Sequence, residues 1–129
     1  MTQFLLDTDV LIDFFKKRLY AQHLLANLKE KGDFFLSVLT VSELRAGWTE
    51  EEASYFLPKL YALAKRAPIT DEIAERAGAF RHIYKSRGVS LPTIDTLIAA
   101  TAITGDYQLV TNNKKHYPFA ELRLYPLTH

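Results

Sequence analysis

The sequence has no cysteine. This absence excludes disulfide bonds, zinc sites built on thiolates and catalysis by a thiol nucleophile. A histidine-based zinc site is not predicted either, because the four histidines are far apart and lack the spacing of zinc ligands: His23, His82, His116 and His129. Glycine and proline are scarce, with five of each, and there is no low-complexity tract, which excludes a collagen-like, linker-like or disordered chain.

An excess of one charge and a long apolar run are missing as well. Sixteen basic and fifteen acidic side chains leave a formal net charge of +1. A protein that binds duplex nucleic acid mainly through phosphates carries a large basic excess, whereas local contacts with RNA depend on where the charges lie. No apolar stretch approaches the ~20 residues that span a bilayer. The N-terminal region has no basic leader, and aspartates interrupt its apolar stretch. We therefore expect a cytoplasmic protein without a membrane segment.

The pattern of apolar residues predicts alternating strands and helices. The 129 residues suit a single domain, residues 1–129, with one core. Short apolar runs predict strands at residues 4–6, 34–38, 67–69, 108–111 and 122–125. Because helical segments separate these strands, the connections must be crossovers. The fold class predicted is α/β, with a central, mostly parallel sheet of about four to five strands and helices on both faces.

Helix boundaries follow from capping residues and helix breakers. Helical spacing predicts helices over residues 10–15, 20–31, 51–66, 70–88 and 91–105, and another that starts near Thr40. Thr70 is the predicted N-cap of its helix, and Gly88 the stop. Pro58 predicts a break in the helix of residues 51–66, because proline lacks an amide proton and its ring clashes with the preceding turn.

Three carboxylates follow or precede the predicted strands where a ligand would bind. Asp7 follows the first strand, Glu43 follows the second, and Asp95 lies in the first turn of the helix before the fourth strand. Ligands of open parallel sheets bind at the carboxyl ends of the strands, so the three acids converge if the strands are neighbours. Each acid also has a local explanation. Asp7 could cap a helix, the pattern from Thr40 to Glu43 could form a capping box, and the helix dipole favours Asp95.

Convergence of the three carboxylates predicts a bound cation. Two unit negative charges ~5 Å apart repel by about 3 kcal/mol at an effective dielectric constant near 20. Ligands that are all oxygen select a hard ion such as Mg²⁺ or Mn²⁺. Such an ion can activate water and neutralise the charge that develops on a phosphate.

Four segments, in order along the chain, resemble the motifs of the PIN domain family. They are residues 5–12 (LLDTDVLI), 41–47 (VSELRAG), 95–102 (DTLIAATA) and 110–117 (VTNNKKHY). The resemblance covers nearly the whole chain, and among PIN domains the chain is most similar to the VapC-like toxins of toxin–antitoxin modules. It implies a PIN-like three-layer fold and the activity of a Mg²⁺- or Mn²⁺-dependent endoribonuclease. The partners implied are an RNA substrate, a cognate antitoxin and a second copy of the chain in a homodimer.

The resemblance also implies roles for individual residues. Asp7 and Asp95 match the family's main metal ligands, and Glu43 matches the acid that completes the cluster. Thr111 and Asn113 match polar residues that shape the pocket. His116 stands where the family usually has a fourth acid, so it is either a substitute ligand or a surface residue of a turn. Asp9 either compensates for the missing acid or is a solvated turn residue. With His116 as a ligand, Mn²⁺ would be favoured.

Two other functions are compatible with parts of this pattern. The same fold without the fourth acid could be a catalytically weak or inactive module that binds RNA or protein. A receiver-type signalling domain also has a parallel sheet and an N-terminal acidic pair, but it needs an aspartate at the end of its third strand. Residues 51–70 contain no aspartate, which counts against this second alternative. Aromatic residues on the early helices predict an apolar interface: Phe14, Phe15, Trp48, Tyr55 and Phe56.

Overall fold

The computed structural model describes residues 1–127. The fold is built on a five-stranded sheet. The strands lie in the order β3-β2-β1-β4-β5, and every neighbouring pair is parallel. Their bounds are β1 Thr2–Leu6, β2 Gly32–Ser37, β3 Lys65–Ala67, β4 Gln108–Val110 and β5 Arg123–Leu124. The predicted α/β class is confirmed, and the sheet is parallel throughout.

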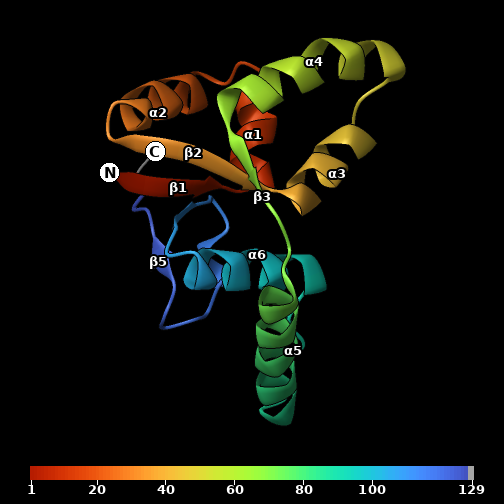
Figure 1. Cartoon of the computed structure of the whole chain (residues 1–129), viewed down its shortest axis with the longest axis vertical. Coiled ribbons are helices and arrows are strands. Elements are labelled where there is room, and N and C mark those ends of the chain that lie inside the picture. The colour runs from red at the N-terminus through yellow and green to blue at the C-terminus, as the bar shows by residue number, and fades with distance from the viewer. Residues whose placement is uncertain (128–129) are drawn as a thin grey trace.

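Helices cover both faces of the sheet, as the three-layer prediction requires (Figure 1). They are α1 Thr8–Phe15, α2 Leu19–Lys29, α3 Val38–Ala46, α4 Glu50–Leu63, α5 Asp71–Ser86 and α6 Thr93–Thr104, with a 3₁₀ turn, η1, at Lys114–His116. Successive side chains of a strand point to opposite faces. Phe4 and Leu6 of β1 therefore pack under α1, α2 and α4, whereas Leu5 packs against α6. Helix α6 is buried between the sheet and α5, which fixes the position of its first turn.

The caps of α5 confirm two predicted boundaries. The Thr70 hydroxyl accepts a hydrogen bond from Ile73 N at 3.2 Å. Gly88 has a positive φ of 80°, which glycine adopts without steric cost. Its amide donates to the Lys85 carbonyl, and the Val89 amide donates to the Tyr84 carbonyl, which closes the helix.

Other predicted boundaries differ from the structure, among them two that involve proline. Helix α4 continues through Pro58 instead of breaking there. The ring removes one backbone hydrogen bond, but the helix is held by the burial of Ala53 and Leu60 on either side. The third strand lies at Lys65–Ala67, two residues earlier than predicted, since Pro68 has no amide proton for the ladder.

The strand order reverses between β1 and β4. From β1 the chain moves outward to β2 and β3, and then crosses back over β1 to add β4 and β5. The carboxyl ends of β1 and β4 therefore lie side by side, joined beyond the last residue of β1 by a hydrogen bond of 3.0 Å from Asp7 N to the Val110 carbonyl. In parallel sheets, this reversal point is where ligands bind. In the part of the chain that the structure describes, no helix is long and apolar enough to cross a membrane.

Candidate active site

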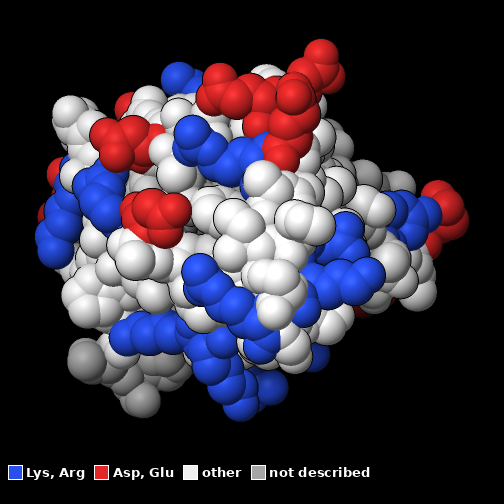
Figure 2. All heavy atoms as spheres, turned by 90° about the horizontal axis from the view of Figure 1, so that it is seen from below, with Lys and Arg blue, Asp and Glu red and all other residues white. Residues whose placement is uncertain are grey.

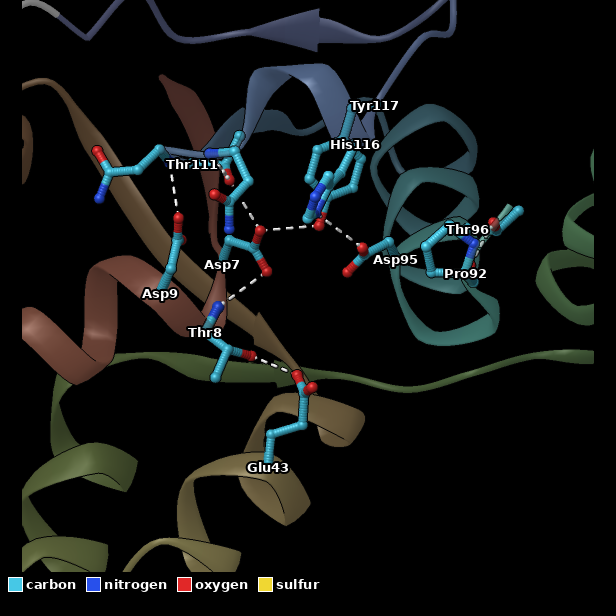
Figure 3. Close-up of polar contacts among 12 residues, drawn as sticks. Asp7, Thr8, Asp9, Glu43, Pro92, Asp95, Thr96, Thr111, His116 and Tyr117 are labelled. Carbon is cyan, nitrogen blue, oxygen red and sulfur yellow. Dashed lines mark hydrogen bonds and ion pairs between the residues drawn. The ribbon is translucent and has the colours of Figure 1, made fainter. Parts of the chain in front are cut away.

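Asp7 lies at the centre of the reversal point, directly after β1 (Figure 3). It is the N-cap of α1, and its Oδ1 accepts a hydrogen bond of 2.8 Å from Thr8 N. The local explanation of Asp7 as a helix cap is therefore correct. Its side chain is also nearly buried, at 5% exposure, and an ionised carboxylate in such a place needs further hydrogen bonds or an opposite charge.

Two hydroxyl groups supply those hydrogen bonds from the segment after β4. Thr111 Oγ1 and Tyr117 Oη each donate to Asp7 Oδ2 at 2.8 Å. Thr111 Oγ1 itself accepts from Asn113 N at 3.0 Å, so its one proton is directed at Asp7. The ring of Tyr117 is packed in the core on the α6 face of the sheet, at 3% exposure. Burial, followed by the negative charge of Asp7, raises the pKa of Tyr117 above its usual range, which keeps its hydroxyl protonated.

Asp95 faces Asp7 from the first turn of α6, and His116 lies beside it. His116 Nδ1 is 3.3 Å from Asp95 Oδ2, with the imidazole 44% and the carboxylate 25% exposed. Burial and then the charge of Asp7 raise the pKa of Asp95, while His116 and the Tyr117 hydroxyl act in the opposite direction. Asp7 is thus close enough to Asp95 to disfavour the negative charge of Asp95. Ligation of a cation by His116 stays a prediction.

Glu43 reaches the same edge of the sheet from α3, through Thr8. Thr8 Oγ1 donates to Glu43 Oε1 at 2.6 Å and lies 3.1 Å from Oγ1 of the fully buried Thr40. The expected capping box of Thr40 and Glu43 is wrong, because α3 begins earlier, with Ser37 as its N-cap. Glu43 therefore lies in the second turn of α3, where the helix has no unpaired backbone amide for it to accept from.

Asp9 belongs to a neighbouring polar network. Its carboxylate accepts hydrogen bonds from the backbone amides of Val10, at 2.8 Å, and Asn112, at 2.9 Å. The Asn112 amide group donates at 2.7 Å to the hydroxyl of Tyr20, which donates to Asp13. Burial and the charge of Asp7 raise the pKa of Asp9 to about 6, despite the two backbone amides. Asp9 is thus a partly buried residue that joins α1 to the segment after β4.

Asp7 and Asp95 form the pair that best suits a metal ion. Within residues 1–127, no three His, Cys, Asp or Glu side chains come together as a metal-binding group. Mg²⁺ and Mn²⁺ nevertheless need only one or two carboxylates, since they keep several of their water molecules. A pair of repelling carboxylates, one of them partly exposed, matches that requirement in donor chemistry. Glu43, held by Thr8, is a neighbour of the pair.

Tyr117, Thr8 and Asn112 have no role predicted from the sequence, although all three lie in the four motifs. Each contributes through a hydroxyl or amide group whose partner is far away in the sequence, with Tyr117 and Asp7 separated by 110 positions. The sequence does offer one indication for Tyr117. It directly follows the candidate ligand His116, and the hydroxyl of a buried tyrosine usually has a hydrogen-bond partner.

A groove between α1, α2 and α4 lies apart from the carboxylates. Its volume is about 740 Å³, and Phe14, Phe15, Tyr55 and Phe56 line its floor and walls. Phe15 packs against Phe56 with ring centroids 5.2 Å apart, while Tyr55 is 61% exposed. Three basic residues also line the groove: Lys17, Lys29 and Lys59. The expected apolar surface on the early helices is thus present as a groove with positive charge around it.

Comparison with known proteins agrees with this fold. The model of the PIN domain family matches residues 4–122. The chain is 34% identical over 116 residues to ribonuclease VapC1 of Methanocaldococcus jannaschii, a match that covers 90% of this chain and 79% of that protein. It is 34% identical over 115 residues to ribonuclease VapC19 of Mycobacterium tuberculosis, covering 88% and 91% of the two chains.

Solved structures give the same result. A chain in the complex VapBC2 of Rickettsia felis, bound to a DNA fragment from its promoter, superposes with a TM-score of 0.85 at 22% identity, covering 96% of this chain and 98% of that one. A chain of a toxin–antitoxin complex from Klebsiella pneumoniae has a TM-score of 0.72 at 28% identity, covering 92% and 93%.

The family match spans most of the sequence, so this chain belongs to the PIN domain family of nucleases. Its relatives at 34% identity place it, within that family, among the VapC ribonucleases of toxin–antitoxin systems. The resemblance predicted from the four motifs is therefore confirmed. The comparisons also favour a nuclease over the alternative of an inactive binding module.

Proposed function

We propose that the chain is a toxin that hydrolyses RNA with a divalent cation, Mg²⁺ or Mn²⁺, held by Asp7 and Asp95. The observation that carries this proposal is that Asp7, directly after β1, and Asp95, in the first turn of α6, face each other at the reversal point of the sheet (Figure 3). Bringing two carboxylates together is unfavourable unless a positive charge compensates them. A cation bound there lowers the pKa of its water and neutralises charge on the phosphate.

The residues around the pair hold it in place. Thr8 N, Thr111 and Tyr117 fix the Asp7 carboxylate, and His116 fixes one oxygen of Asp95. In this proposal Glu43, which accepts a hydrogen bond of 2.6 Å from Thr8 Oγ1, would accept a proton from water on the α3 side of the site. No covalent intermediate is needed, because water is the nucleophile.

Exposed Lys and Arg side chains provide a route for RNA to the site, although the net charge of the chain is only +1. Figure 2 shows Lys and Arg side chains in a band across one face, with most Asp and Glu toward its upper edge. A small hollow lined by Arg81, His82 and Lys85 of α5 adjoins Ser90 and Leu91, which lead directly into α6 and Asp95. Lys114 and Lys115 are exposed on η1, next to His116. Clustered cations of this kind bind the phosphates of RNA.

Cleavage of a fluorescent single-stranded RNA with and without EDTA tests the metal-dependent activity. We expect Asp7→Asn and Asp95→Asn to lower the rate by at least about a hundredfold, and EDTA to abolish cleavage by the unaltered protein. Asp33→Asn is the matched control, because Asp33 is exposed on β2 away from the site. Full activity of both site variants, or full activity in EDTA, would refute the proposal.

We also propose that an antitoxin segment occupies the groove between α1, α2 and α4. An amphipathic helix presents spaced apolar anchors to such a groove, and the three lysines favour a segment with acidic residues beside those anchors. An Arg or Lys of the antitoxin would match the carboxylates of the site and compete with the cation. We also propose that a second copy of the chain is a partner, in the homodimer that the family resemblance implies.

A further inference from the structure

The two carboxylate oxygens of Asp7 accept different numbers of hydrogen bonds. Oδ2 accepts from Thr111 Oγ1 and Tyr117 Oη, both at 2.8 Å. Oδ1 accepts only from Thr8 N, at 2.8 Å, among the bonds of the described residues. A carboxylate oxygen has two lone pairs in its plane. Both lone pairs of Oδ2 are therefore in use, while one lone pair of Oδ1 remains.

The two hydroxyl groups cannot easily turn away from Oδ2. Thr111 Oγ1 already accepts from Asn113 N at 3.0 Å, which leaves its proton for Asp7. The ring of Tyr117 is packed among buried residues on the α6 face, which fixes its hydroxyl at the end of a rigid arm. The opposite edge of the carboxylate is fixed by the first turn of α1, since Asp7 is the cap of that helix.

Ions differ in how they use a carboxylate. Mg²⁺ requires near-octahedral geometry with short bonds and keeps several waters, so one oxygen from each carboxylate suffices. Ca²⁺ takes six to eight oxygens and often binds both oxygens of one carboxylate. A carboxylate with one oxygen already saturated favours the first ion over the second.

We infer that Tyr117 and Thr111 are positioning residues that reserve Oδ1 of Asp7 for the cation and thereby set a preference for Mg²⁺ over Ca²⁺. This inference rests on the proposed use of a metal by Asp7 and Asp95. The Tyr117 hydroxyl thus has a role that can be tested, because substitution by phenylalanine removes the hydroxyl and keeps the ring. Neighbouring groups of this kind tune the affinity of a site for its metal, by about 10- to 100-fold when they are mutated.

Calorimetric titration of the protein with MgCl₂ and, separately, CaCl₂ tests the inference. The unaltered protein is expected to bind Mg²⁺ more tightly than Ca²⁺. In Tyr117→Phe one lone pair of Oδ2 becomes available, so the ratio of the two affinities should fall by about tenfold. Thr111→Val should act in the same direction, and Thr111→Ser, which keeps the hydroxyl, should restore the ratio. Tyr84→Phe is the matched control, because the Tyr84 hydroxyl donates to the Pro118 carbonyl at the surface.

Infrared difference spectra provide a second readout that does not depend on activity. The separation between the two carboxylate stretching bands narrows when a cation binds both oxygens, and this narrowing is expected with Ca²⁺ in Tyr117→Phe and not in the unaltered protein. An unchanged Mg²⁺-to-Ca²⁺ ratio and an unchanged spectrum in Tyr117→Phe would overturn the inference alone. Absence of any divalent binding by the unaltered protein would instead overturn the proposed metal-dependent function.

Discussion

At the scale of single residues, Asp7 and Asp95 have different surroundings although both are proposed ligands. Asp7 accepts three hydrogen bonds and caps a helix, so three donors of the fold depend on its carboxylate. Asp95 has His116 beside it, but burial and the charge of Asp7 together raise its pKa. Removal of the negative charge should therefore have opposite effects on stability at the two positions.

Urea unfolding at neutral pH in EDTA measures that difference. Asp7→Asn is expected to lower the free energy of unfolding by about 1–3 kcal/mol. The NH2 group of asparagine would face a hydrogen-bond donor where the carboxylate now offers an acceptor. Asp95→Asn is expected to raise it, because the variant relieves repulsion by Asp7. Equal effects at the two sites would contradict this explanation.

Asp9 should make stability depend on pH in a direction unusual for an aspartate. Its pKa rises from the ordinary 3.8 to about 6, so the folded state retains a proton that the unfolded state has lost. The stability contributed by Asp9 is full below about pH 4 and is lost as the pH rises through about 6.

The comparison of unaltered protein with Asp9→Asn isolates this effect, since asparagine does not titrate. Between about pH 4 and pH 7 in EDTA, the free energy of unfolding of the unaltered protein should fall relative to the variant by about 1–2 kcal/mol. This figure is the full shift reduced for partial exposure. Lost hydrogen bonds in the variant add an offset that is independent of pH. A difference that stays constant across the range would show that Asp9 has an ordinary pKa.

At the scale of helices and strands, the sequence predicted most of the fold because each signal was local. The apolar runs predicted all five strands, although β1, β2 and β3 begin two residues earlier than predicted, and Thr70 and Gly88 predicted the ends of α5. The capping box was placed on the wrong helix, since Thr49 and Glu52 of α4 form it. The pattern from Thr40 to Glu43 fits the same motif, and only tertiary packing shows that Thr40 is buried within α3.

The candidate site was predictable to a lesser extent. Asp7 and Asp95 could be paired from their positions beside strands, because the topology of a parallel sheet brings such positions together. Glu43 reaches the same edge of the sheet, but in residues 1–127 it does not form a group of three carboxylates with them. The hydrogen bonds of Thr8 and Tyr117 could not be predicted, because they depend on how β1 and β4 pair and on which way η1 turns. The hydrogen bond of Glu43 could not be predicted either, because its partner, Thr8, lies on α1 and not on the helix of Glu43.

Helix α4 offers a direct test of how packing overrides helix propensity. Pro58 is exposed inside the helix and provides no amide for the carbonyl of Ser54. Pro58→Ala restores that hydrogen bond, and we expect the free energy of unfolding to rise by about 1–2 kcal/mol, which is less than the full cost of proline because its rigidity also restrains the unfolded chain. Thermal unfolding followed by circular dichroism measures the change, with Lys59→Ala as the neighbouring control. A lower midpoint in Pro58→Ala would show that α4 needs the proline ring.

The groove beside α4 yields another prediction at this scale. Tyr55 and Phe56 line the groove, whereas Tyr61 is exposed on the same helix outside it. Phe56→Ala should weaken binding of the antitoxin by about 2 kcal/mol or more, as expected for a central aromatic anchor. Tyr61→Ala should leave the affinity unchanged. Calorimetry with the purified antitoxin is the measurement, and equal losses in the two variants would place the antitoxin elsewhere.

At the scale of the whole molecule, surface composition bears on assembly. Exposed apolar side chains lie outside the groove as well, among them Ile12, Val38 and Ile94 near the ends of α1, α3 and α6. Exposed apolar side chains of this kind are typical of an interface when they form a patch. We expect the protein to be a dimer of about twice 14.8 kDa by light scattering at micromolar concentration. A mass of one chain at high micromolar concentration would contradict the homodimer.

The reversal of strand order between β1 and β4 also determines when the candidate site can form. Thr111 and Tyr117, which hold the Asp7 carboxylate, follow Asp7 by 104 and 110 positions in the chain. Strands β2 and β3 can pair with β1 during synthesis, whereas β4 must be made and inserted beside β1 afterwards. A growing chain therefore carries its first carboxylate without the hydroxyls that orient it. The orientation of this carboxylate is thus one of the last features of the described fold to form during synthesis.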